Sequence, residues 1–187
     1  MRIIGGKLKR KSLNFLRSLN TRPLKDSVKE SIFNVISHSN ILNINLNKSQ
    51  ILDLYSGIGS FGIECLSRGA SSVTFVEKET KALKILENNL KELILLQNSV
   101  IINQKTEEFL SKKQNLKFDI IFLDPPFKDV NFIKDLKLIY KNKIYKKKHA
   151  VIIHREKNSS EDLKNVLDIL IIKKYGRSKI IFAKFSG

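Results

Sequence analysis

The fold of this 187-residue chain is restricted most strongly by an alternation of two hydrophobic periods that starts at Ile51. Short apolar runs typical of strands are separated by stretches in which apolar residues recur every three or four positions, as on one face of a helix. Alternating strands and helices favour a parallel sheet with helices on both faces. The predicted strands are 51–55, 73–76, 99–103, 118–123 and 149–154, and the predicted helices are 60–68, 78–96, 106–113 and 131–142.

The C-terminal part departs from this alternation. Residues 167–175 and 179–185 resemble two strands separated by three residues, so we expect an antiparallel hairpin that adds one antiparallel edge strand to the sheet. The lysine-rich segment 141–148 is predicted to be a solvated loop.

The N-terminal part also differs from the main alternation. Residues 2–16 combine two adjacent glycines with basic and apolar residues, which suits a small hairpin or an extended arm. A helix is predicted over residues 26–38, begun by a capping box of Ser27 and Glu30. We therefore expect a small N-terminal basic arm and helix over residues 1–45, followed by one α/β domain over residues 46–187.

The placement of positive charge is more informative than its total. The net charge of +17 comes from 35 Lys and Arg against 18 Asp and Glu, but lysines dominate, as AT-rich coding would produce. Residues 1–30 carry nine basic residues and two acidic ones. This arm is either solvated or a surface that contacts nucleic-acid phosphates. The candidate RNA-binding residues are Arg2, Lys7, Lys9, Arg10 and Arg22.

Several classes of protein are disfavoured by the sequence. No apolar run approaches the roughly 18 residues that a membrane span needs, and no apolar segment typical of a secretory signal follows Met1. A single cysteine, Cys65, cannot form an internal disulfide, which suits a reducing cytoplasm. We expect a cytoplasmic protein without a metal site, and assign no catalytic role to its histidines, which are His38, His149 and His154.

A glycine-rich turn follows the first strand of the alternating region. Asp53-Leu-Tyr-Ser-Gly57-Ile-Gly59-Ser-Phe-Gly62 contains GxGxxG, and Glu77 ends the next strand. The glycines alone would also fit a dinucleotide. Asp53 favours S-adenosylmethionine, because a carboxylate would repel a pyrophosphate but hold a cationic amino-acid group, and Glu77 suits its ribose hydroxyls. The candidate cofactor-binding residues are Asp53, Tyr55, Ser56, Gly57, Gly59 and Glu77.

The fourth strand ends in a rigid polar corner, Asp124-Pro125-Pro126-Phe127. Proline fixes its own φ and biases the preceding residue toward an extended conformation, so the Asp124 carboxylate and the Pro125 carbonyl have fixed directions. Two fixed acceptors suit the NH₂ group of a nucleobase, and Phe127 offers a ring for stacking. The candidate catalytic residues are therefore Asp124, Pro125 and Phe127. The alternative is a proline-ended strand whose aromatic residue belongs to the core.

These motifs and three further segments carry a resemblance to one family. The segments are Arg2-Ile-Ile-Gly-Gly6, Arg22-Pro23 leading into Val28-Lys-Glu-Ser-Ile-Phe-Asn34, and Leu66-Ser-Arg-Gly-Ala70. The chain resembles the RsmD family over nearly its whole length. That resemblance implies a Rossmann-like class I methyltransferase with a seven-stranded, mostly parallel sheet and an N-terminal extension that contacts RNA.

The same resemblance implies an activity. The family transfers a methyl group from S-adenosylmethionine to the exocyclic N2 amine of one guanine in 16S ribosomal RNA, on the assembled small subunit. We expect this chain to act as a monomer. It departs from the family at Leu24, Ser27 and Lys29, and Lys105 stands near the place where an Asp or Asn often contacts the adenine.

Two other interpretations remain open from the sequence. One is an amine methyltransferase for adenine or cytosine in another RNA or in DNA, or for a protein glutamine, although glutamine enzymes typically have Asn in place of Asp124. The other is a non-catalytic RNA-binding assembly factor. A protein that only binds RNA has no need for the three carboxylates Asp53, Glu77 and Asp124.

Overall fold

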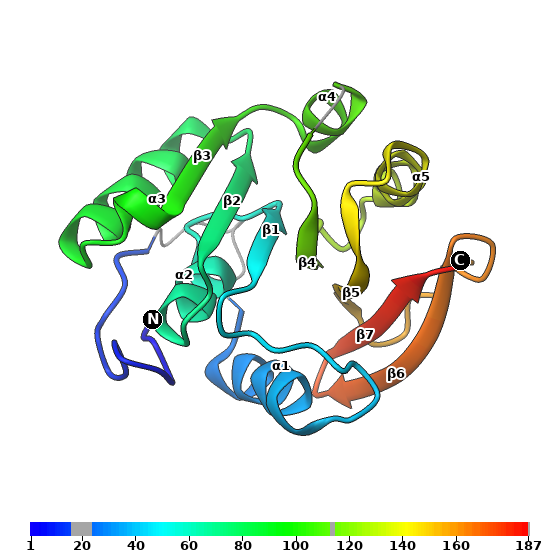
Figure 1. Ribbon diagram of the computed structural model, residues 1–187, viewed down its shortest axis with the longest axis horizontal. Coiled ribbons are helices and arrows are strands. Elements are labelled where there is room, and N and C mark those ends of the chain that lie inside the picture. The colour runs from blue at the N-terminus through cyan, green and yellow to red at the C-terminus, as the bar shows by residue number, and fades with distance from the viewer. Residues whose placement is uncertain (16–23, 113–114, 187) are drawn as a thin grey trace.

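The computed structural model describes residues 1–15, 24–112 and 115–186 and shows a seven-stranded sheet with helices packed against it (Figure 1). The strands are β1 (Gln50–Leu54), β2 (Ser72–Glu77), β3 (Ser99–Asn103), β4 (Phe118–Leu123), β5 (Tyr145–Glu156), β6 (Leu167–Tyr175) and β7 (Ser178–Phe185). The helices are α1 (Asp26–His38), α2 (Ser60–Ser67), α3 (Thr80–Glu92), α4 (Thr106–Ser111) and α5 (Phe132–Asn142), with a 3₁₀ turn η1 (Leu96–Asn98).

The strand order is β3-β2-β1-β4-β5-β7-β6. Strands β1 to β5 pair in parallel, which confirms the α/β class, and the chain changes direction across the sheet between β1 and β4. The C-terminal hairpin forms, but its predicted position was wrong in one respect. The antiparallel strand β7 pairs with β5 as well as with β6, so it lies inside the sheet and β6 forms the edge.

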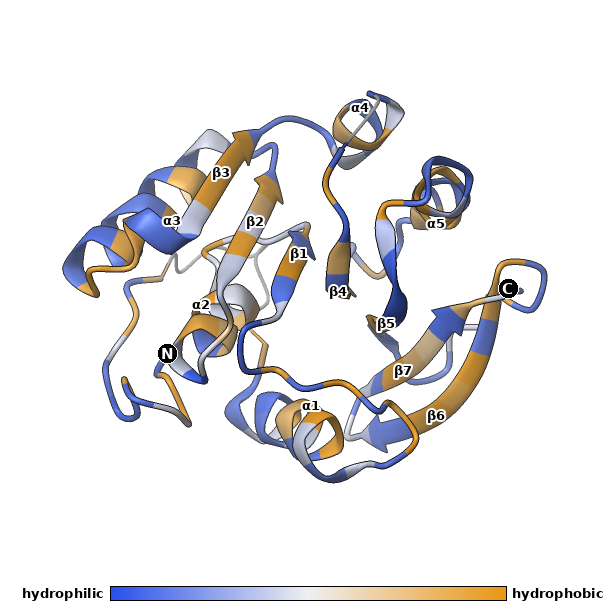
Figure 2. Ribbon diagram, viewed as in Figure 1, coloured by the Kyte–Doolittle hydropathy of each residue, from blue (hydrophilic) through white to orange (hydrophobic). Residues whose placement is uncertain are grey.

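Each face of the sheet buries its own hydrophobic core. Along β4, Phe122 faces α1, α2 and α3, whereas Ile121 and Leu123 face α4 and α5, because neighbouring residues of a strand point to opposite faces. Most strands carry mainly apolar residues, β5 also has polar stretches at both ends, and the surrounding helices carry apolar and polar residues on different sides (Figure 2). No helix among the described residues is long and apolar enough to cross a membrane.

Some local boundaries differ from the predictions. Helix α1 spans the predicted residues, but Lys25 is its N-cap and no side chain caps it, so the predicted capping box was wrong. Ser27 lies inside the first turn instead of before it. Helix α3 ends at Glu92, and Ile94 takes a positive φ of 58° with 82% of its surface exposed, although the periodicity placed it on the buried face.

Strand β5 begins four residues before the predicted strand. Tyr145 pairs with Phe118 of β4, so Lys146, Lys147 and Lys148 belong to the strand and the predicted solvated loop was wrong over this part. The pattern of apolar residues shows which residues are buried and not which residues form backbone hydrogen bonds. Exposed lysines inside a strand are therefore missed by this pattern.

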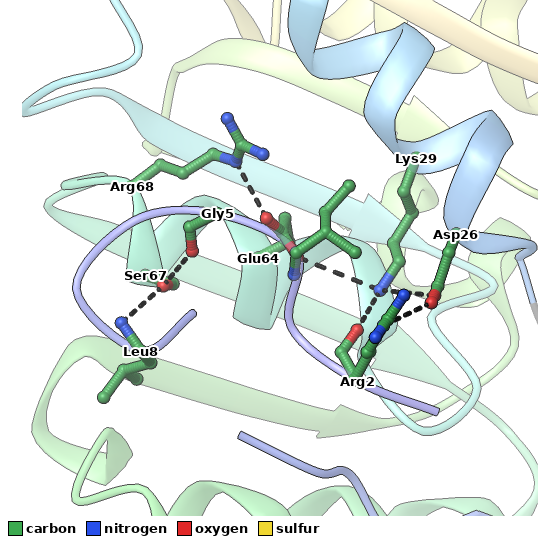
Figure 3. A network of polar contacts seen from close by, with 9 residues as sticks. Arg2, Gly5, Leu8, Asp26, Lys29, Glu64, Ser67 and Arg68 are labelled. Carbon is green, nitrogen blue, oxygen red and sulfur yellow. Dashed lines mark hydrogen bonds and ion pairs between the residues drawn. The ribbon is translucent and has the colours of Figure 1, made fainter. Parts of the chain in front are cut away.

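The N-terminal arm forms a small hairpin closed by one antiparallel bridge between Arg2 and Ser12. Its Gly5-Gly6 segment lies against the C-terminal end of α2: Ser67 donates its hydroxyl to the Gly5 carbonyl at 2.6 Å and accepts the N–H of Leu8 at 3.0 Å (Figure 3). A Cβ on Gly6, whose φ is +73°, would lie 2.0 Å from the Ser67 carbonyl oxygen. Two segments of the family resemblance are therefore in direct contact.

Buried charges connect the arm to α1 and α2 (Figure 3). The fully buried Lys29 donates to the Arg2 carbonyl at 2.6 Å and lies 3.8 Å from Glu64, which accepts the N–H of Ile4 at 2.9 Å and Nε of Arg68 at 2.8 Å. Burial lowers the pKa of Lys29. The nearby Glu64 and Asp26 carboxylates act in the opposite direction and offset part of this lowering. Arg2 and Lys29 thus hold the base of the arm in place.

Candidate active site

The ends of four neighbouring strands meet at one edge of the sheet. Leu54 of β1 pairs with Val76 of β2 and with Leu123 of β4, and Leu123 in turn pairs with Ile153 of β5. The next residue along each strand is therefore Tyr55, Glu77, Asp124 or His154. This edge lies where the strand order reverses between β1 and β4, which is the usual ligand position in open α/β sheets.

Asp53 anchors the glycine turn from inside the fold. Its carboxylate is 1% exposed and accepts the N–H of Gly62 at 3.0 Å, which ties the first turn of α2 to β1. Burial raises the pKa of Asp53 well above its usual range, and the negative Asp124 and Glu77 carboxylates raise it further. The hydrogen bond from Gly62 acts in the opposite direction and lowers this pKa. The same grouping of carboxylates would attract a cation.

Tyr55 begins the turn with a positive φ of 57° and points to the α4–α5 face. Its hydroxyl donates to Asp135 of α5 at 2.5 Å. Burial raises the pKa of Tyr55, and it also raises the pKa of Asp135, to about 6. The predicted cofactor residue Tyr55 thus attaches the turn to α5 through a buried carboxyl that the sequence did not reveal.

The two first glycines of the turn have different surroundings. A Cβ on Gly57 would meet nothing within 4 Å, whereas a Cβ on Gly59 would lie 2.3 Å from the buried Leu86 of α3. Both residues have a positive φ, 55° and 81°. Gly57 therefore adjoins open space beside the strand ends, and Gly59 lets α3 pack closely on the turn.

Glu77 closes the other side of this turn. One carboxylate oxygen accepts the N–H of Gly57 at 2.8 Å, and the other accepts the N–H groups of Lys78 and Glu79 at 2.9 Å each. A carboxylate has about four lone-pair positions, so Glu77 can also accept hydrogen bonds from hydroxyl groups.

These residues fit the adenosine and amino-acid parts of S-adenosylmethionine. Next to the open space at Gly57, the buried Ser56 hydroxyl finds no hydrogen-bond partner within the described ranges. Glu77 supplies acceptors for hydroxyls, and a bound cation nearby would favour the charged form of the buried Asp53 carboxyl. Lys105 precedes α4, and its side chain is 70% exposed and lies 4.0 Å from Glu108. That Lys105 lies near the adenine of the donor stays a prediction.

The catalytic candidates lie on the β4 side of the same edge. The Asp124 backbone N–H points to the Leu54 carbonyl at 3.4 Å, and its side chain is 25% exposed. Nδ1 of His154 lies 2.7 Å from Oδ1 of Asp124, and the His154 ring meets Phe127 edge-on with centroids 5.5 Å apart. The structure therefore brings Asp124 and Phe127 together with a histidine to which sequence reasoning assigned no role.

Arg155 binds the backbone carbonyls of the proline corner. Its guanidinium donates to the Pro126 carbonyl at 3.0 Å and to the Phe127 carbonyl at 2.8 Å, with a longer contact of 3.5 Å to the Pro125 carbonyl. Nε pairs with Glu161 at 2.7 Å. The predicted acceptor Pro125 O thus keeps a lone pair for a further donor, because the Arg155 contact is long.

The basic arm lies apart from the carboxylates. Its contacts with Ser67 are at the C-terminal end of α2, and the carboxylate edge is at the N-terminal end, roughly 12 Å away along an eight-residue helix. Lys7, Lys9 and Arg10 are exposed, whereas Arg2 pairs with Asp26 at 3.0 Å. A hollow of about 300 Å³ beside the arm is lined in part by Lys9, Arg10 and Arg68. Arg22 lies outside the described residues.

Sequence reasoning missed His154, Arg155 and Asp135. A usable signal existed for His154, because it ends the predicted strand 149–154 and parallel neighbours finish at the same edge. Arg155 and Asp135 gave no such signal, since their partners are backbone carbonyls and a tyrosine hydroxyl that only the folded chain brings close.

Comparison with known proteins gives a consistent result. Residues 1–184 match the model of the family described as conserved hypothetical protein 95. The chain is 36% identical to ribosomal RNA small subunit methyltransferase D of Buchnera aphidicola subsp. Baizongia pistaciae, over 97% of this chain and 88% of the relative. It is 34% identical to the protein of the same name in Haemophilus influenzae, over 84% and 80%.

A solved structure supports the same relation. The structure named "Putative methyltransferase yhhF", from Escherichia coli, superposes with a TM-score of 0.85 and 26% identity, over 99% of this chain and 97% of that one. The Rossmann-like methyltransferase architecture predicted from the sequence is thereby confirmed.

Proposed function

The chain belongs to the conserved hypothetical protein 95 family, the RsmD family, and we propose on this basis that it methylates the exocyclic N2 amine of a guanine in 16S ribosomal RNA. S-adenosylmethionine is the methyl donor. The observation that supports this function best is the meeting of Asp53, Glu77 and the Asp124-Pro-Pro-Phe127 corner at one edge of the sheet.

The donor binds on the β1–β2 side of this edge. Glu77 accepts the ribose hydroxyls, Ser56 supplies the buried hydroxyl, and Gly57 leaves the space that a side chain would fill. Asp53 acts from beneath the turn, since its carboxylate shapes α2 and adds to the negative field that favours a cationic ligand. When bound, the donor supplies an electrophilic methyl group on a positive sulfur.

The acceptor amine binds on the β4 side. A guanine N2 amine is a weak nucleophile because its lone pair is delocalised into the ring. Asp124 and the Pro125 carbonyl accept its two N–H bonds and thereby direct the nitrogen lone pair toward the methyl group. The new N–C bond would form as the bond between the methyl group and the donor sulfur breaks, which would leave that sulfur as a neutral thioether, and the amine would release one proton to solvent.

The RNA is recognised separately from the reaction. A paired base cannot reach this edge, so the guanine is flipped out or presented by a loop, and Phe127 stacks on its ring. Residues 1–45 contact RNA, with Lys7, Lys9, Arg10 and Arg22 near phosphates and Arg2 at the base of the arm, and residues 46–187 carry the transfer reaction. The protein acts as a monomer in the cytoplasm on assembled small subunits.

One experiment tests this function. The protein is incubated with a labelled methyl donor and either unmodified small subunits or naked 16S RNA, and the methylated nucleoside is identified by mass spectrometry. We expect N2-methylguanosine, formed at a higher rate on subunits. A methylated adenine or cytosine, or label in protein, would contradict the guanine assignment, and no incorporation would favour an assembly factor.

A further inference from the structure

His154 occupies an unusual place for a histidine with no assigned role. Its side chain is 7% exposed, and Nδ1 lies 2.7 Å from Oδ1 of Asp124. It stands one residue beyond Ile153, which pairs with Leu123 immediately before Asp124. The two side chains therefore extend side by side from neighbouring parallel strands.

The surroundings of the ring decide which nitrogen carries the proton. Nε2 is buried and has no hydrogen-bond partner among residues 1–15, 24–112 and 115–186. A proton on Nε2 would leave a buried N–H unpaired and would set the Nδ1 lone pair against the carboxylate oxygen. With the proton on Nδ1, the ring donates a charge-assisted hydrogen bond to Asp124, which is the stronger arrangement.

The position of the ring is fixed from several sides. Phe127 meets it edge-on at 5.5 Å, and His154 pairs with Ile180 of β7 through the backbone. The next residue, Arg155, holds the Pro126 and Phe127 carbonyls. The same stretch of β5 thus holds both the corner and the carboxylate that the corner presents.

From this geometry we infer that His154 is a positioning residue for Asp124: it holds Oδ1 through Nδ1–H and leaves Oδ2 to accept the amine of the substrate. This role rests on the proposed function. A carboxylate that rotates freely presents its acceptor in many directions, whereas one oxygen held by His154 fixes the direction of the other. His154 does not itself contact the amine.

A purely structural histidine would behave differently in two matched variants. His154→Phe keeps a ring of similar size and removes the donor. His154→Asn shortens the side chain, but its amide N–H₂ can reach the place of Nδ1. If the ring only fills space, phenylalanine is the better replacement. If it positions Asp124, asparagine is the better one.

The kinetic test uses the full chain with unmodified small subunits and saturating S-adenosylmethionine. His154→Phe should lower kcat by roughly 10- to 100-fold with little change in KM for the donor, as expected for loss of a residue that orients a reactive group. His154→Asn should recover most of kcat. His149→Phe, on β5 five residues before His154, is the control and should leave kcat unchanged. A His154→Phe variant that keeps kcat within about twofold of the wild type overturns the inference.

A spectroscopic test keeps the inference separate from the proposed function. With three histidines in the chain, the His154 ring nitrogens can be assigned by ¹⁵N NMR against the His154→Asn variant. We expect the Nδ1–H form in the wild type and its loss in Asp124→Ala. The Nε2–H form in the wild type would refute the pairing. If the wild type methylates no guanine, the proposed function fails, and these spectra still decide whether His154 holds Asp124.

Discussion

At the scale of single residues, the carboxyl groups near the strand ends differ most in what holds them. Asp53 accepts a backbone N–H, Asp124 faces an imidazole, and Asp135 accepts the Tyr55 hydroxyl. Only Asp124 has a side chain that is substantially open to solvent among these three. The side chain best placed to meet a substrate is thus the one in the proline corner.

The buried Asp135 makes stability depend on pH. Burial raises its pKa to about 6 from an ordinary value of 3.8, so between these values the folded chain holds a proton that the unfolded chain has released. The free energy of unfolding should therefore fall as pH rises from about 4 to about 6 and then stay level with respect to this group. Asp135→Asn keeps an acceptor for Tyr55 and should remove this part of the fall.

Urea unfolding across this pH range measures the effect. The difference in unfolding free energy between Asp135→Asn and the wild type should grow as pH rises to about 6 and then become constant. Glu108→Gln, on the exposed side of α4, should run parallel to the wild type. A difference for Asp135→Asn that is independent of pH would show that this carboxyl does not titrate in the range.

At the scale of elements, the β1–α2 turn combines Gly59, which packs against α3, with Gly57, which is proposed to face the methyl donor. Alanine at Gly57 or Gly59 imposes a similar strain of roughly 1–2 kcal/mol, because both have positive φ. At Gly59 the new Cβ also meets the buried Leu86, which adds roughly 1–3 kcal/mol. Gly59→Ala should therefore lower the unfolding free energy more than Gly57→Ala.

For donor affinity the order of the two variants should be reversed, with the larger loss in Gly57→Ala. Gly57→Ala should weaken S-adenosylmethionine binding, measured by calorimetry, because its methyl group enters the open space beside Ser56 and Glu77. Gly59→Ala should bind the donor nearly as well once it is folded. Equal effects of both substitutions on stability and affinity would argue against separate roles.

The elements themselves were largely predictable, and the exceptions have physical causes. The spacing of apolar residues predicted α1, β3 and β4 with their observed bounds, because burial against the core determines that spacing. The spacing of apolar residues predicted an α3 that is too long. The helix ends before Ile94, whose positive φ cannot be inferred from that spacing. The same spacing also predicted a β5 that is too short, because the strand begins with Tyr145 and three lysines that do not follow an apolar pattern.

At the scale of the whole molecule, the surface proposed to contact RNA and the surface proposed to carry the reaction are on different parts of the fold. The arm is fastened to α1 by Lys29 and to α2 by Glu64 and Ser67, away from the edge where β1, β2 and β4 finish (Figures 1 and 3). The sequence predicted both surfaces from charge and motifs. It did not predict their separation, which follows from the docking of Gly6 on Ser67.

The arm should contribute a measurable part of the salt dependence of RNA binding. Because Arg2 is held by Asp26, the informative variant changes Lys7, Lys9 and Arg10 to glutamine. For each phosphate that the variant no longer neutralises, the slope of log affinity against log salt should become shallower by about 0.7 to 0.9. A control that neutralises Lys141, Lys147 and Lys148 removes the same charge. An equal change of slope in both would show that total charge acts, and not the arm.

The most direct measurement is the effect of Asp124→Ala on two quantities together, turnover on unmodified small subunits and affinity for S-adenosylmethionine. Because Asp124 is assigned to the acceptor amine and Glu77 to the donor, turnover should fall by at least about 100-fold while donor affinity stays nearly unchanged. Unchanged turnover, or a loss of turnover that merely follows a loss of donor binding, would contradict the assignment of the proline corner to the amine.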